Sequence, residues 1–283
     1  MTLPPLGTGF AGISMKQHAA LFVLFSAALL SPAHALDERY PSYKPYTELS
    51  GRVEIAGAPA PRSLMLLWTE SFRMLQPDVS LVETEPGRGE VKIRAAMQTL
   101  AILVHKDNPL DCLPLSKLRA VYANENPVWG DAGATGEWAA RPVERFVREP
   151  GSSDNGFFAE KVLGGAALPA NAETVTRATR LLRALQSRPG GIGYAPAGYR
   201  GENVRPLKIS DGGDCAAPSI ASVQRAVYPL ARLVHLEGPA SEAGRAFFDY
   251  VLSSEGQHDA TIAGFYPLPW IFAVEERTKL GLD

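Results

Sequence analysis

The sequence predicts an α/β fold, and three features of the chain lead to that prediction. Short β-rich runs alternate with segments in which apolar residues recur every three or four positions. Turns such as Gln76-Pro77, Asn108-Pro109 and Pro189-Gly190 separate these runs. The chain has 283 residues, of which 46% are hydrophobic and 20% charged. A globular chain of this length can form one large domain or two smaller lobes.

The first expected elements follow from local patterns. Residues Arg52–Gly57 are typical of a strand that runs into a turn. A helix is expected from Pro61, because apolar residues then fall on one face until Gln76-Pro77 ends it. Val79–Val82 predicts a short strand, and the continuous apolar run Leu100–Val104 predicts a buried one.

The rest of the chain continues the alternation. The expected elements are helices over 115–122, 157–163, 174–187 and 241–253 and extended segments over 192–195 and 227–236. The helix over 174–187 carries Arg177, Arg180 and Arg183 at intervals of three. These arginines are interpreted as a solvated face, with a docking patch as the alternative.

Residues 1–35 have the pattern of a secretory signal peptide. Residues 19–30 are apolar, Met15-Lys16 precede them, and Ala33-His34-Ala35 supplies a small-x-small cleavage site. The apolar run is too short to span a bilayer comfortably. We therefore expect an exported, periplasmic protein that begins at Leu36, with Met1 or Met15 as the start codon, and no second membrane anchor.

Charge and cysteine content exclude some classes of protein. Lys and Arg number 28 against 30 Asp and Glu, so the formal net charge is −2, which argues against a nucleic-acid-binding surface. Cys112 and Cys215 are the two cysteines of the chain. In an exported protein such a pair is more often a disulfide than two free thiols. Histidines share no ligand spacing with them, so no metal site is expected.

Residues Arg148–Phe158 form the most informative local motif. An arginine precedes a Gly-Ser-Ser-Asp turn that begins a helix. The first N–H groups of a helix have no intrahelical acceptor and carry partial positive charge, so together with an arginine they can bind an anion. The alternative is that Ser152, Ser153 or Asp154 only caps the helix.

Several motifs occur together in the order found in one family. They are Leu100–Leu110, Leu115–Tyr122, Arg148–Phe158, Gly191–Tyr194, Tyr228–Arg232, Phe248–Gln257 and Gly264–Leu268. In these residues the chain resembles the phosphate-binding proteins of ABC transporters, and the resemblance extends from about Leu49 to Pro269. It implies a type II periplasmic-binding-protein fold, in which two α/β lobes are joined by a two-strand hinge. Lobe one would comprise residues 36–103 and 205–283, and lobe two residues 104–204.

The resemblance also implies a ligand set at the cleft between the lobes. Arg148 matches the arginine that forks onto phosphate, and Gly151 and Ser152 match the first residues of the family's Gly-Ser-Gly-Thr turn. In lobe one, the turn containing Ala58, Pro59 and Ala60 would offer backbone N–H groups. A Cys112–Cys215 bridge would join the two lobes near the hinge.

This chain departs from the family pattern at three places. Ser153 and Asp154 replace Gly and Thr of the turn, and Arg88 replaces a serine ligand. The segment 89–100 is too short for the family's next helix and for the acidic residue that accepts the proton of hydrogen phosphate. Two repairs are open: Arg88 or Arg94 could add positive charge, and Asp154 could accept the ligand's proton instead of repelling the anion.

The predicted function is therefore that of an exported solute-binding protein for phosphate or a related oxyanion. It would act as a monomer and deliver its ligand to an ABC transporter permease in the inner membrane. The alternative is a diverged binding module with another small ligand or with a protein-interaction or sensing role. No Gly-x-Ser-x-Gly elbow, dinucleotide fingerprint or phosphate loop supports an enzyme, and no cofactor is expected.

Overall fold

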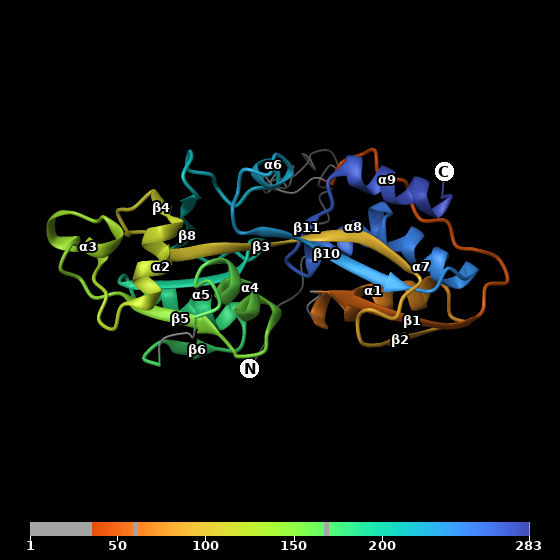
Figure 1. Cartoon of the computed structure of the whole chain (residues 1–283), viewed down its shortest axis with the longest axis horizontal. Coiled ribbons are helices and arrows are strands. Elements are labelled where there is room, and N and C mark those ends of the chain that lie inside the picture. The colour runs from red at the N-terminus through yellow and green to blue at the C-terminus, as the bar shows by residue number, and fades with distance from the viewer. Residues whose placement is uncertain (1–35, 59–61, 167–169, 283) are drawn as a thin grey trace, which may run out of the picture. The chain divides into compact units, whose positions relative to one another are not determined.

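The computed structural model describes residues 36–58, 62–166 and 170–282. The predicted signal peptide, residues 1–35, lies outside the described residues, as do Pro59 and Ala60. The strands are β1 Gly51–Ala58, β2 Val79–Glu83, β3 Val91–His105, β4 Cys112–Pro114, β5 Glu144–Arg148, β6 Glu173–Val175, β7 Gly191–Pro196, β8 Val204–Pro206, β9 Lys208–Ser210, β10 Ala231–Gly238 and β11 Tyr266–Pro267. The helices are α1 Arg62–Leu75, α2 Leu115–Ala123, α3 Trp129–Ala132, α4 Ser153–Lys161, α5 Ala178–Ser187, α6 Ile220–Gln224, α7 Glu242–Val251, α8 Ser254–Ile262 and α9 Trp270–Leu280, with a 3-10 turn at Gly136–Trp138. The predicted α/β class is confirmed (Figure 1).

One sheet connects most of the described strands. Its order is β2-β1-β10-β3-β7-β5-β6, and β8 and β11 also pair with β3. The pairs β1·β2, β5·β6 and β5·β7 are parallel, whereas β10 and β3 pair antiparallel with each other and with their outer neighbours β1 and β7. A separate parallel pair joins β4 to β9. Parallel strands need helical crossovers, which α1, α4 and α5 supply.

Two hydrophobic cores lie on this framework. The first core contains side chains from residues 40–96 and 234–273, with Trp68, Phe72 and Phe248 fully buried at 0% exposure. The second core contains side chains from residues 97–230 together with Tyr266, with Trp129 and Phe158 also at 0%. Each core has aromatic side chains at its centre, where their large apolar area contributes most to stability. Two cores on one chain agree with the two-lobe fold that the family resemblance implies.

Strands β3 and β10 pass from one core to the other. In β3, Ala96 belongs to the first core and Met97 to the second. In β10, Val234 lies in the first core, while Ala231 packs against the second. Figure 1 shows these two strands side by side where the two groups of elements meet. The buried residues of the two cores show that β3 leaves the first core near residue 97 and that β10 enters it after residue 231. The lobe boundaries at 103/104 and 204/205 stay a prediction.

Some element boundaries differ from the sequence-based expectation. The helix expected over 174–187 begins at Ala178, because residues 173–175 form β6 and pair with the end of β5. The helix expected from Phe157 begins earlier, at Ser153, where Ser152 Oγ accepts a hydrogen bond from the Asn155 N–H. Helices α8 and α9 were not predicted.

The predicted disulfide between Cys112 and Cys215 is present, with the two Cα atoms 6.0 Å apart. The expectation that it joins the two lobes was wrong. Strand β4 pairs with β9, and the neighbouring side chains Leu113, Ile209 and Ala216 all belong to the second core. The bridge therefore fastens two segments of one core, and it does not limit movement between the cores.

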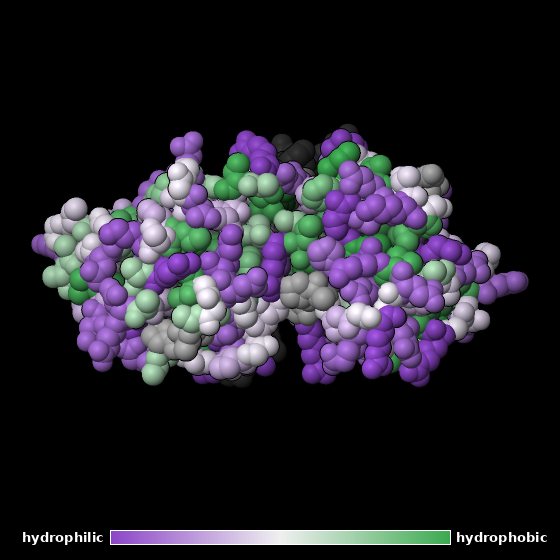
Figure 2. Space-filling model, viewed as in Figure 1, coloured by the Kyte–Doolittle hydropathy of each residue, from purple (hydrophilic) through white to green (hydrophobic). Residues whose placement is uncertain are grey.

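The face of the molecule shown in Figure 2 is mostly polar. On the face shown in Figure 2, hydrophilic residues cover most of the molecule, and hydrophobic residues lie in small groups between them. In the described part of the chain, the exposed large hydrophobic side chains are Leu66, Met74, Leu75, Val227, Ile262 and Ile271. Within the described ranges, no helix is both long and apolar enough to cross a membrane.

Candidate functional site

A cavity of about 840 Å³ lies among the starts of three helices and two strand-to-helix turns. Its lining residues are Gly57, Arg62, Ser63, Pro86, Arg148, Glu149, Gly151, Ser152, Ser153, Asp154, Thr176, Arg177, Ala178, Thr179, Pro196, Tyr199, Ala263 and Phe265. We call this space the interlobe cavity, because helices α1 and α8 pack on the first core while α4 and α5 pack on the second. Its lining includes three arginines and two acidic residues.

The topology of the sheet brings two of these helix starts together. Strands β5 and β6 are parallel neighbours, and Arg148 at the end of β5 is paired with Val175 at the end of β6. The helices that follow, α4 and α5, therefore begin at the same edge of the sheet. Helix N-termini at the carboxyl ends of parallel strands are the usual place for an anion in such a fold.

Backbone N–H groups of α4 and α5 are available at the cavity. In α4, the N–H of Asn155 has Ser152 Oγ as its acceptor, whereas Ser153 and Asp154 at the first two helical positions have no intrahelical acceptor. In α5, no side chain caps the helix, and Ala178 and Thr179 occupy the corresponding positions. Gly151 adopts a φ of 83°, which glycine accepts without strain and which turns the chain into α4.

The hydroxyl of Ser152 is engaged within the turn. Ser152 Oγ donates to the Glu149 carbonyl oxygen at 2.8 Å, besides accepting from the Asn155 N–H at 3.2 Å. Ser152 therefore caps α4. Ser152 still lines the cavity, but its hydroxyl proton is committed to the backbone.

Arg148 presents donors that no described residue accepts. The Arg148 side chain is 11% exposed, and its Nε and Nη1 atoms are buried without a hydrogen-bond partner in the described part of the chain. Its Nε lies 3.5 Å from Asp154 Oδ2, which is an ion pair but not a hydrogen bond. Buried polar groups nearly always have partners, so these donors are suited to an anionic ligand.

Asp154 lies beside Arg148 and is itself buried, at 6% exposure. Its Oδ1 accepts a hydrogen bond from Gln98 Nε2 at 2.9 Å. Burial raises the pKa of this carboxyl above its ordinary value of 3.8, and the charges of Arg148 and Arg232 and the Gln98 hydrogen bond oppose that rise. One oxygen of the Asp154 carboxyl thus forms an ion pair with Arg148, and the other accepts a hydrogen bond from the Gln98 amide.

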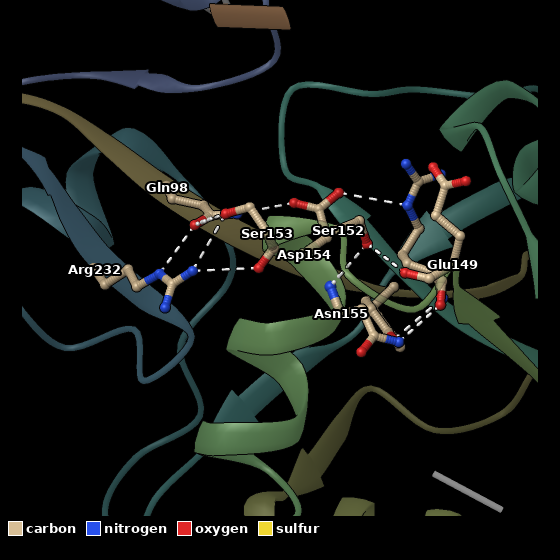
Figure 3. Close-up of polar contacts among 9 residues, drawn as sticks. Gln98, Glu149, Ser152, Ser153, Asp154, Asn155 and Arg232 are labelled. Atoms are coloured by element: carbon tan, nitrogen blue, oxygen red, sulfur yellow. Dashed lines mark hydrogen bonds and ion pairs between the residues drawn. The ribbon is translucent and has the colours of Figure 1, made fainter. Parts of the chain in front are cut away.

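Gln98 and Arg232 complete a network behind the turn (Figure 3). Gln98 Oε1 accepts from Ser153 Oγ at 3.1 Å and from Arg232 Nε at 2.9 Å. Arg232 Nη2 also donates to the Ser153 carbonyl oxygen at 3.2 Å. In Figure 3, dashed lines run from Arg232 to Gln98 and from there to Asp154. The start of α4 is therefore fastened to β3 and β10.

The profile of the PBP superfamily domain matches residues 83–255. The chain belongs to the PBP superfamily. The match includes the start of α4, the start of α5 and most of the second core.

Two relatives are similar to this chain over different lengths. The phosphate-binding protein PstS of Pseudomonas aeruginosa is 24% identical over 315 residues, which cover 93% of this chain and 98% of the relative. The phosphate-binding protein PstS 2 of Streptococcus agalactiae is 32% identical over 143 residues, which cover 47% of this chain and 48% of the relative.

Solved structures show the same fold. A possible phosphate-binding protein from Planctomyces limnophilus has a TM-score of 0.69 at 16% identity, covering 82% of this chain and 98% of its own. An ABC-type phosphate transport receptor from Vibrio cholerae has a TM-score of 0.61 at 15% identity, covering 77% of this chain and 100% of its own. These likenesses support the two-lobe type II fold.

The structure brings together five of the residues predicted to bind the ligand. Arg148, Gly151, Ser152, Ser153 and Asp154 all line the interlobe cavity.

The other predicted site residues lie elsewhere or are not described. In the first lobe, Gly57 lines the cavity and Ala58 ends β1 just before the undescribed Pro59 and Ala60. Arg88 is exposed and is not among the lining residues, although Pro86 of the same turn is.

The suggestion that Arg94 repairs the site was wrong. Arg94 Nη2 forms an ion pair with Glu275 at 2.6 Å, and its Nε pairs with Glu276. Its guanidinium also lies 4.2 Å from the centre of the Phe272 ring. Arg94 therefore fastens α9 to β3 and has no role at the cavity.

The sequence analysis assigned no ligand-binding role to several residues that line or support the cavity. Arg177, interpreted as part of a solvated face, lines it at the start of α5, and Arg62 lines it at the start of α1. Polar residues directly after a short strand, as in Thr176-Arg177, could have indicated the first of these. The contribution of Gln98 and Arg232 depends on strand pairing and had no local signal. Among the described residues, no group of three or more His, Cys, Asp or Glu side chains could hold a metal ion.

Proposed function

We propose that this protein binds phosphate, or a closely related oxyanion, in the interlobe cavity. The observation that carries the proposal is the Arg148 guanidinium, whose Nε and Nη1 donors are buried and have no acceptor among the described residues. It lies beside the starts of α4 and α5, whose first backbone N–H groups have no intrahelical acceptor. Planar guanidinium donors and helix N-termini both favour a tetrahedral oxyanion. The names of the relatives support phosphate within this class.

The charges around the cavity favour an anion over a neutral solute. Arg62 and Arg177 line it as exposed cations, and the described residues form no ion pair with either. Glu149 and Asp154 oppose them, but Asp154 is paired with Arg148. Exposed cations that line a cavity raise the rate at which an anion enters, an effect that added salt weakens.

The role that follows is delivery of the anion rather than its chemical conversion. We infer that the protein is exported to the periplasm, acts as a monomer and passes its ligand to an ABC transporter permease. The relatives are binding proteins, which supports a function without catalysis. The two strands that link the cores would let the lobes close around the ligand, a motion expected of a two-lobe binding protein.

Isothermal titration of the purified protein with a panel of anions tests this proposal. We expect phosphate to bind with a stoichiometry of one and to raise the melting temperature, with arsenate as the closest competitor. Nitrate and chloride at equal ionic strength serve as controls for non-specific screening. If sulfate or a phosphonate binds while phosphate does not, the oxyanion class stands and phosphate is excluded. If no anion in the panel binds, the proposed function is wrong.

A further inference from the structure

Gln98 is placed so that its amide orientation is fixed. The residue is fully buried, at 0% exposure, in the middle of β3. Its Oε1 receives two hydrogen bonds, from Ser153 Oγ and Arg232 Nε, so the opposite end of the amide must face Asp154 as a donor. The reverse orientation would set an N–H against the Arg232 N–H. Only the observed orientation satisfies all of these groups.

Arg232 holds the same turn from a second strand. Its side chain is 22% exposed, lies 4.3 Å from the centre of the Phe157 ring and donates to both the carbonyl oxygen and the hydroxyl of Ser153. Partial burial lowers the pKa of Arg232, and the charges of Glu160 and Asp154 act in the opposite direction. The Arg232 guanidinium is therefore partly desolvated where it contacts the start of α4.

The two residues belong to the strands that pass between the cores. Arg232 pairs directly with Gln98 in the β10·β3 register, next to Met97, where β3 leaves the first core for the second. The start of α4 is thus attached to the segment of the sheet that both lobes share. A movement of these strands would be transmitted to Ser153 and Asp154, and from Asp154 to Arg148.

We propose that Gln98 and Arg232 are positioning residues of the anion site: they fix Ser153 and Asp154 against β3 and β10, and Asp154 in turn orients the Arg148 guanidinium. This inference rests on the proposed function for its effect on binding, but its effect on Asp154 and on α4 does not need a ligand. Neither residue needs to touch the anion.

The main test compares phosphate affinity in matched variants. Gln98→Met keeps the length of the side chain and removes the hydrogen bonds, and we expect phosphate affinity to fall by about tenfold, the order expected for one charge-assisted hydrogen bond. Arg232→Met should act in the same direction, and Arg232→Lys should restore part of the loss. Gln257→Met is the control, because Gln257 is also 0% exposed and donates to the Ala95 and Val251 carbonyl oxygens, away from the cavity. It should lower the melting temperature without changing affinity.

A double-mutant cycle separates positioning from general destabilisation. If Gln98 acts through Asp154, Gln98→Met should have no further effect on phosphate affinity in an Asp154→Asn background. Additive losses would show that Gln98 does not act through Asp154 and would overturn the inference.

Two measurements on the protein without ligand keep this test independent of the proposed function. Gln98→Met should raise the pKa of Asp154, because the hydrogen bond that the Gln98 amide donates to the carboxyl favours its ionised form. Carbon NMR of the Asp154 carboxyl measures this pKa. The groups that face this carboxyl are Arg148, Arg232 and Tyr194. Amide hydrogen exchange at Asn155 and Gly156, whose N–H groups bond to Ser152, should also become faster in Gln98→Met and not in Gln257→Met. If both measurements change but the wild type binds no phosphate, only the proposed function fails. If neither changes, the positioning role is wrong whether or not phosphate binds.

Discussion

Replacing Arg148 by alanine should weaken phosphate binding by about a hundredfold. The Nε and Nη1 donors of the guanidinium are buried and have no hydrogen-bond acceptor among the described residues, so we expect these two donors to reach ligand oxygens. Two charge-assisted hydrogen bonds at roughly 1.5 kcal/mol each amount to about 3 kcal/mol, which corresponds to about a hundredfold in the dissociation constant. Isothermal titration of the wild type and of Arg148→Ala measures this ratio directly.

Arg277→Ala is the matched control for that variant. Arg277 forms an ion pair with Asp249, and the two side chains are 15% and 14% exposed, close to the 11% and 8% of Arg148 and Asp154. Both variants remove an arginine from a buried ion pair, but only Arg148 lines the cavity. We expect Arg277→Ala to leave phosphate affinity unchanged, and we expect Arg148→Ala to shift the melting temperature by no more than a few degrees relative to it. Equal phosphate affinity in the wild type and Arg148→Ala would refute the assigned site.

The other predictions concern Asp154, the disulfide and Arg177. Asp154→Asn should reduce phosphate affinity, because the variant loses the charge that orients Arg148; an increase would mean that Asp154 chiefly repels the anion. Because burial raises the folded-state pKa of Asp154 above 3.8, its ionisation costs stability as the pH rises from that value through the folded-state pKa. The melting temperature of Asp154→Asn should therefore improve relative to the wild type across that interval, and a difference that does not vary with pH would contradict the shift. The Cys112–Cys215 bridge closes a separation of 103 residues, so its reduction should lower the melting temperature. The chain-entropy model gives a loss of about 4 to 5 kcal/mol in the free energy of unfolding. Phosphate affinity should not change, because the bridge lies within one core. Thiol titration before reduction should find no free cysteine in the denatured protein. Arg177→Ala should slow phosphate association several-fold at low salt and have little effect at high salt, as stopped-flow measurements would show.

Local patterns were sufficient for the elements whose sequence and environment agree. The helix after Pro61 and the strand at Ile192–Ala195 were predicted from periodicity and turn residues, and the structure has α1 and β7 there. The anion turn was also recognisable, because an arginine, a glycine and hydroxyl residues stand in sequence before α4.

Features that depend on strand pairing could not be predicted in this way. Thr174 and Val175 were expected to begin a helix but belong to β6, because they pair in parallel with the end of β5. The disulfide was assigned to two lobes because the pairing of β4 with β9, which places both cysteines beside one core, has no local signal. Gln98 and Arg232 are 134 residues apart, and only the β10·β3 register brings them together behind Asp154.

A crystal structure of the protein grown with phosphate would test the central claim most directly. Our account predicts one phosphate ion in the interlobe cavity, with oxygens within hydrogen-bond distance of the Arg148 guanidinium and of the free backbone N–H groups at the start of α4. It also predicts that Asp154 keeps its hydrogen bond from Gln98 in that complex. A phosphate ion bound elsewhere, with Arg148 making no contact to it, would contradict the account.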